Sequence, residues 1–105
     1  MHTLPFGAML TDALFDILRD AAVQCLPGHP DFVPNLCWHT SYTDSVALEH
    51  WGINAFSRSY MRDQDIFTVD GVAFCVAPED QARAAGHVLD WQKGVGVVQI
   101  DTPKT

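Results

Sequence analysis

Two residues with metal-ligand chemistry, Cys37 and His39, are separated by one residue near the middle of the chain. Successive side chains of a strand point to opposite faces, so on a strand both would project from the same face, within reach of one metal ion. His50 or Cys75 would complete a set of soft nitrogen and sulfur ligands suited to zinc or iron. The sequence therefore gives a candidate mononuclear metal site at Cys37, His39 and His50.

The alternative interpretation of the same pair is structural. Metal motifs usually come as paired clusters such as Cys-x-x-Cys, and one thiol beside one imidazole is more often a packed thiol next to a surface histidine. Cys75 is expected inside a strand, where a free cysteine behaves as a small buried hydrophobe. A Cys-His nucleophile needs a neighbour that lowers the thiol pKa, and no such neighbour is placed by the sequence.

A small enzyme with a histidine or cysteine base is a further alternative. It requires a deep pocket that holds His39, His50 or His87 beside an acid. The serines have no Gly-x-Ser-x-Gly elbow around them, and Asp63 and Asp65 are expected to be solvated turn residues instead of a catalytic pair. We therefore assign no catalytic residue from the sequence.

Length and charge restrict the class of protein. The chain has 105 residues, of which 48% are hydrophobic, so residues 1–105 are expected to form one globular domain. The formal charge of −7 repels the phosphate backbone and argues against nucleic acid as a partner. No apolar run approaches the roughly 20 residues of a membrane span, and the start lacks a signal-peptide pattern, so we expect a cytoplasmic protein without a membrane partner.

The clearest local signal is a β-hairpin centred on Asp70-Gly71. Phe67 to Val69 and Val72 to Val76 flank this pair, and Asp-Gly between alternating apolar runs predicts a two-residue turn. That turn places Val69 opposite Val72 and Phe67 opposite Phe74, with all four on one face. This face is expected to belong to the core.

An amphipathic helix is predicted from Asp12 to Gln24, with Thr11 as its N-cap. Its apolar face is expected to pack on the sheet, and Pro27-Gly28 ends it. Residues 78–86 are predicted to form a short helix with Pro78 at its first position and Gly86 as its C-terminal cap. Residues 87–91 and 95–100 are predicted as two further strands.

The middle of the chain is less determined. Residues 35–42 alternate and predict a strand, whereas residues 44–51 fit a short helix or a strand equally well. Gly52 is expected to end either element. Residues 53–61 are predicted as another strand, and residues 62–65 as a polar turn.

The C-terminal half resembles the HesB-like, or A-type iron–sulfur carrier, family. In that family a phenylalanine before a turn, a Gly-Val strand, a second glycine and a Leu-Asp-aromatic run follow one another with similar spacing. The residues of this chain that match are Phe67, Asp70-Gly71, Val72 to Val76, Gly86, Leu89-Asp90-Trp91, Gly94 and Gly96, and the start Leu10 to Ala13 before a helix also resembles the family.

The resemblance implies a fold more than an activity. Family carriers hold iron or a cluster through one cysteine upstream of the turn glycine and a Cys-Gly-Cys pair near the C-terminus. In this chain the region near Ala47 has no cysteine, and the end reads Ile-Asp-Thr-Pro-Lys-Thr. A cluster held by thiolates is therefore not supported.

Together these observations predict an α+β, mainly β domain, a HesB-like small β-sandwich or barrel with an N-terminal amphipathic helix packed on it. The expected function is that of a non-enzymatic accessory or binding protein that resembles the carriers but lacks a cluster. The cofactor is unknown, with iron or zinc as candidates at Cys37, His39 and His50. An apolar strand edge gives scope for a protein partner or for self-association.

Overall fold

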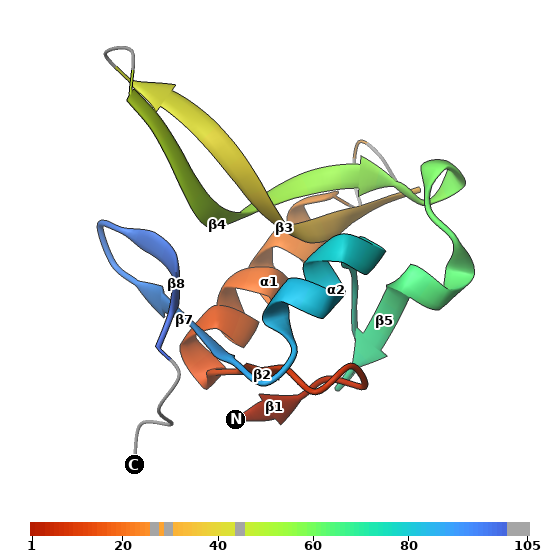
Figure 1. Cartoon of the computed structure of the whole chain (residues 1–105). Coiled ribbons are helices and arrows are strands. Elements are labelled where there is room, and N and C mark those ends of the chain that lie inside the picture. Colours follow the sequence, from red (N-terminus) through yellow and green to blue (C-terminus); the bar gives the residue numbers. More distant parts are fainter. Residues whose placement is uncertain (26–27, 29–30, 44–45, 101–105) are drawn as a thin grey trace.

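A computed structural model of the chain describes residues 1–25, 28, 31–43 and 46–100. These residues form strands, two α-helices and two short 3-10 helices (Figure 1). Their bounds in chain order are β1 His2–Thr3, β2 Met9–Leu10, α1 Asp12–Cys25, β3 Phe32–Thr43, β4 Val46–Ser57, η1 Arg58–Tyr60, η2 Asp63–Asp65, β5 Ile66–Val69, β6 Val72–Cys75, α2 Pro78–Ala84, β7 Val88–Gln92 and β8 Gly96–Gln99. No helix among these elements is both long enough and apolar enough to span a membrane.

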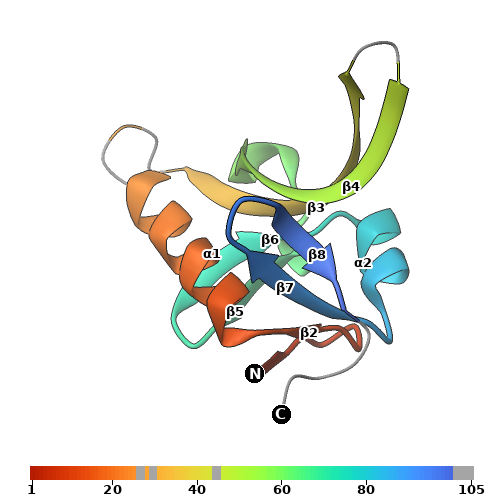
Figure 2. The ribbon, with the colours of Figure 1, turned by 90° about the vertical axis from the view of Figure 1, so that its left-hand side faces the viewer.

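The strands make two open sheets of mixed direction. One has the order β1-β2-β7-β8 and the other the order β4-β3-β6-β5, and each contains one parallel pair, β2 with β7 and β3 with β6. The predicted α+β, mainly β class is confirmed, but the barrel alternative is wrong because neither sheet closes on itself. Helix α1 packs against strands of both sheets (Figure 2). It contributes Leu14, Phe15 and Leu18 to the core.

The predicted hairpin is present as β5 and β6. Phe67 lies opposite Phe74 and Val69 opposite Val72. Both turn residues have positive φ, 47° at Asp70 and 81° at Gly71, as a type I′ turn requires. Val72 and Phe74 are buried, and Phe67 and Val69 pack against the same core, so the predicted core face is confirmed.

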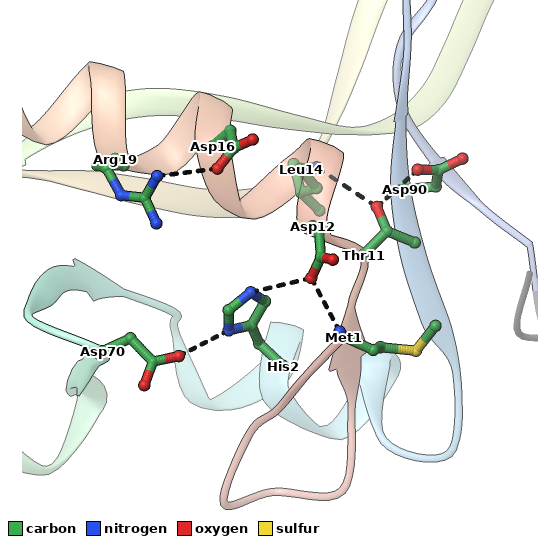
Figure 3. A network of polar contacts seen from close by, with 9 residues as sticks. All are labelled: Met1, His2, Thr11, Asp12, Leu14, Asp16, Arg19, Asp70 and Asp90. Atoms are coloured by element: carbon green, nitrogen blue, oxygen red, sulfur yellow. Dashed lines mark hydrogen bonds and ion pairs between the residues drawn. The ribbon is translucent and has the colours of Figure 1, made fainter.

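Helix α1 begins where Thr11 caps it, as predicted. The Thr11 hydroxyl oxygen accepts a hydrogen bond from the backbone N–H of Leu14 (3.3 Å) and donates one to the buried carboxylate of Asp90 on β7 (2.6 Å; Figure 3). The Thr11 side chain therefore caps the start of the helix and also joins it to β7, which is distant in the sequence.

A second polar contact joins the N-terminal strand to two distant elements. The imidazole of His2 lies between the carboxylates of Asp12 at the start of α1 (3.2 Å) and Asp70 in the β5–β6 turn (2.8 Å; Figure 3). The same ring stacks on Phe15, with centroids 3.8 Å apart. His2 thus brings β1, α1 and the hairpin turn together.

The middle of the chain differs from the prediction. The segment whose type the sequence left open is a strand in its described part, since β4 begins at Val46; residues 44 and 45 lie outside the described residues. Gly52 does not end the element, because β4 continues through it to Ser57. The strand predicted up to residue 61 stops at Ser57, where the serine side chain caps a 3-10 turn.

Strands β3 and β4 pair along their whole described length, and their outer part leaves the body of the domain (Figures 1 and 2). We call residues 39–43 and 46–50 the β-ribbon. Apolar side chains on it face water: Tyr42 is 79% exposed, Val46 55% and Leu48 53%. The β-ribbon therefore leaves several of its apolar side chains unburied.

The Thr11 contact gives a stability prediction. Thr11→Val keeps the side-chain shape but removes the hydroxyl that caps α1 and donates to Asp90, so the free energy of unfolding should fall by about 2 kcal/mol. Thr11→Ser retains the hydroxyl and should lose less than half as much. Urea unfolding measures both variants, and a valine variant as stable as the wild type would contradict the role given to this contact.

Candidate functional site

The chemistry-bearing side chains predicted in the middle of the chain gather on one face of the β3–β4 ladder. His39 lies directly opposite His50, and Cys37 lies opposite Gly52. Because opposed residues of an antiparallel pair share a face, Cys37, His39, Ser41 and His50 point the same way. We call these four residues the polar row. The predicted shared face of Cys37 and His39 is confirmed, and His50 lies beside them.

The opposite face of the same ladder belongs to the core. Trp38 lies opposite Trp51, with the two rings edge to face and their centroids 5.6 Å apart. Trp51 is only 3% exposed. The alternation of strand side chains thus buries the indoles and leaves the polar row on the other side.

Gly52 is what allows His39 its position. A Cβ built on Gly52 would overlap the imidazole carbon Cε1 of His39 and lie within 3.0 Å of its Nδ1. The imidazole therefore lies across the glycine backbone of the neighbouring strand, in space that any other residue would fill. This packing explains a glycine in the middle of a twelve-residue strand.

Contacts run along the polar row from one end to the other. Cys37 Sγ lies 3.7 Å from His39 Nδ1, and the rings of His39 and His50 meet edge to face with centroids 4.2 Å apart. His50 Nδ1 lies 3.0 Å from the carbonyl oxygen of Trp51, and His50 Nε2 lies 2.7 Å from Ser41 Oγ. A carbonyl only accepts, so Nδ1 carries the proton, and in the neutral ring Nε2 accepts the Ser41 hydroxyl.

Both described thiols of the region are protonated at neutral pH. Burial raises the pKa of Cys37, and the nearby Asp80 carboxylate raises it further. Burial raises the pKa of Cys75 to about 11, and its Sγ donates to the side-chain oxygen of Asn35 at 3.6 Å. The arrangement disfavours a thiolate nucleophile, and a metal ion bound at Cys37 would have to displace a proton.

Helix α2 closes the edge of β3 beside the polar row. The buried carboxylate of Asp80 accepts a hydrogen bond from the backbone N–H of Trp38, and burial raises the pKa of this carboxyl. The guanidinium of Arg83 lies over the Trp38 ring, 4.8 Å from its centroid. The sequence did not single out Asp80, because only the tertiary packing of α2 brings it to β3.

The expectation that Asp63 and Asp65 are both solvated is wrong for Asp65. Its carboxylate is buried and accepts hydrogen bonds from Arg62 Nε (3.0 Å) and Gln81 Nε2 (2.7 Å). It connects the turn before β5 to helix α2. Gln81, sixteen residues away in the sequence, is the partner that a local turn pattern does not reveal.

Two chemistries are available to the polar row. Ser41 and His50, oriented by the Trp51 carbonyl, have the geometry of a hydroxyl and its general base. The thiol of Cys37 and the imidazoles of His39 and His50, which lie next to one another along the row, also supply soft ligand atoms. In the described part of the chain, no three His, Cys, Asp or Glu side chains converge as they stand on one metal position; the metal site at Cys37, His39 and His50 stays a prediction that requires side-chain rotation.

The other predicted candidates lie apart from the row. His87 Nδ1 is 3.2 Å from Gln99 Nε2, on the β7–β8 side of the domain. Ser41 and Gly52 were missed as site residues, although their alternation with His39 and His50 on paired strands was a usable signal. No protein-family model matches the chain, and neither a curated protein nor a solved structure is similar enough to count as a match.

The packing of His39 on Gly52 gives a second prediction. Gly52→Ala should push the imidazole away, whereas in a chain carrying His39→Ala the same change should stabilise the strand by about 0.5 kcal/mol, because alanine loses less conformational entropy than glycine. Urea unfolding of the four proteins should give a coupling energy of about 1 kcal/mol. Additive effects of the two substitutions would contradict the contact.

Proposed function

We propose that this protein is a non-enzymatic accessory or binding protein of HesB-like type, related in form to iron–sulfur carriers but without a cluster. The hairpin at Asp70-Gly71, the helix begun at Thr11 and the Leu89-Asp90-Trp91 strand are consistent with the resemblance. The resemblance implies a ligand cysteine near Ala47, and the lack of one there favours a role other than holding a cluster.

The β-ribbon is the observation on which the binding role rests. A two-stranded ribbon outside the body of a domain is marginally stable in water by itself. Exposed apolar side chains at Tyr42, Val46 and Leu48 add unburied surface of the kind that marks interaction sites. A polypeptide that covers the β-ribbon would bury these side chains and support its strands.

A second copy of the chain is the partner that β4 suits best. β4 ends its sheet, runs for twelve residues in an unbroken ladder, and contains neither lysine nor proline. Natural edge strands usually carry a lysine or a proline, which prevents another strand from pairing with them. With only Glu49 as a charged residue, β4 also avoids the repulsion that a chain of net charge −7 meets elsewhere.

The proposal predicts self-association through the β-ribbon. Sedimentation equilibrium should show a concentration-dependent dimer for the wild type, weakened by Val46→Ser combined with Leu48→Ser. Val95→Ser is the matched control, because Val95 is 72% exposed but lies outside the β-ribbon.

The same preparation tests the absence of a cluster. After anaerobic incubation with ferrous iron and sulfide and removal of unbound ions, the visible spectrum should show no cluster. A wild type that stays monomeric at all concentrations would exclude self-association, and a stoichiometric cluster would exclude the proposed absence of a cluster.

A mononuclear metal-binding role is the second candidate. The observation in its favour is the adjacency of Cys37, His39 and His50, which places one sulfur and two imidazoles side by side. A modest rotation of the exposed His39 ring would turn its nitrogens toward a shared ion. Zinc or iron would suit this donor set.

Cobalt(II) titration tests this candidate. Bound cobalt should give thiolate-to-metal charge-transfer absorption that zinc abolishes, that Cys37→Ser removes and that His50→Gln weakens. Affinity should rise with pH, because the pKa of the Cys37 thiol is raised and its proton must leave. His87→Gln is the control outside the polar row. Absorption that survives Cys37→Ser would remove this candidate.

A further inference from the structure

The His2 ring lies between two carboxylates, and this position determines its charge. Its Nδ1 atom is 2.8 Å from a carboxylate oxygen of Asp70, and its Nε2 atom is 3.2 Å from a carboxylate oxygen of Asp12 (Figure 3). An ionised carboxylate only accepts hydrogen bonds, whereas a neutral imidazole has a single N–H to donate. Both contacts are therefore hydrogen bonds only when His2 carries a proton on each ring nitrogen.

The charged groups around the ring favour this protonated form. Asp12 is ionised, because the Met1 ammonium group at 2.8 Å and, to a lesser extent, the His2 ring hold its pKa below the usual value. Arg19, further along α1, pairs with Asp16 at 2.9 Å, and the paired strand β2 contributes no titratable side chain. Loss of the ring proton would leave a nitrogen lone pair that faces a carboxylate oxygen.

β1 is a short edge strand that this ring helps to hold. It has two residues and pairs with β2 at the end of its sheet. The His2 ring also stacks on Phe15 of α1, with centroids 3.8 Å apart and 17° between the ring planes. The next residue after β1, Leu4, is buried, and its backbone N–H donates to the carbonyl oxygen of Ala8. Residues 1–3 therefore form a segment that can detach while the chain from Leu4 onward stays folded.

We propose that His2 is a pH-sensitive latch: its imidazolium holds residues 1–3 against α1 and the β5–β6 turn, and loss of the proton releases them. A histidine side chain typically changes charge between about pH 5 and 8. Because the two carboxylates favour the charged ring, its contribution to the attachment is complete at the acid end of this range and is lost as the pH rises. Below about pH 4 the carboxylates take up protons, and the attachment weakens again.

Release changes the surface at the start of α1. Phe15 is 1% exposed in the attached state, and the departing His2 ring would uncover part of its ring. The outer edge of β2 would lose its paired strand at the same time. The latch concerns β1 and α1, so it does not depend on the proposed self-association or on a metal ion at the polar row.

The backbone contact between β1 and β2 reports whether the latch is closed. In an antiparallel pair of two residues, one position is not hydrogen-bonded and brings the α-protons of the two strands close together. The nuclear Overhauser effect between these protons should be strong at about pH 5.5 and should lose more than half of its intensity by about pH 8. The effect between the His2 and Phe15 rings should disappear over the same range.

Three variants separate His2 from the other groups that titrate. His2→Gln has no charge to lose, so its β1–β2 effect should have the same intensity at both pH values. Asp70→Asn tolerates the left-handed turn but removes one carboxylate, so the midpoint of the transition should fall by about 0.5 pH unit. His87→Gln, on the β7–β8 side of the domain, is the matched control and should leave the midpoint unchanged.

Three results would overturn the proposal. A β1–β2 effect of constant intensity in the wild type would show that the segment does not respond to pH. A transition that persists in His2→Gln would assign it to another group, such as the Met1 amine, which that variant retains. An unchanged midpoint in Asp70→Asn would show that the carboxylate in the turn does not hold the ring.

Discussion

The lack of a side chain at residue 52 is the constraint on which the centre of this structure depends. It lets the His39 imidazole lie across the facing strand, and the ladder continues through Gly52 without a break. His39 then meets Cys37 at one end and His50 at the other, and His50 meets Ser41. A side chain at residue 52 would displace the His39 ring. The other contacts of the polar row depend on this ring, because it meets both Cys37 and His50.

The two faces of the β3–β4 ladder have different roles. On its inner face Trp38 and Trp51 pack into the core that α1 and both sheets share. On its outer face lies the polar row with its titratable groups, and His39, Ser41 and His50 of this row belong to the β-ribbon that extends into solvent. One pair of long strands therefore contributes to the core, positions the candidate site and carries the proposed binding surface.

Short sequence patterns were enough to predict the elements whose conformation depends on residues next to them in the chain. Asp70-Gly71 predicted the hairpin and its register, and Thr11 predicted the start of α1. The prediction that Gly52 ends the helix or strand before it was wrong, because a glycine that accommodates a ring from the facing strand looks the same in sequence as one that stops an element. Asp65 was misread for a similar reason, since its partner Gln81 lies in a later helix.

The packing of His39 on Gly52 can be observed directly in the wild-type protein by proton NMR. The account predicts a nuclear Overhauser effect between the His39 ring proton Hε1 and the α-protons of Gly52, which the ring current should also shift upfield. Absence of this effect, with Gly52 α-protons at ordinary strand positions, would contradict the account. It would show that the polar row does not form as described.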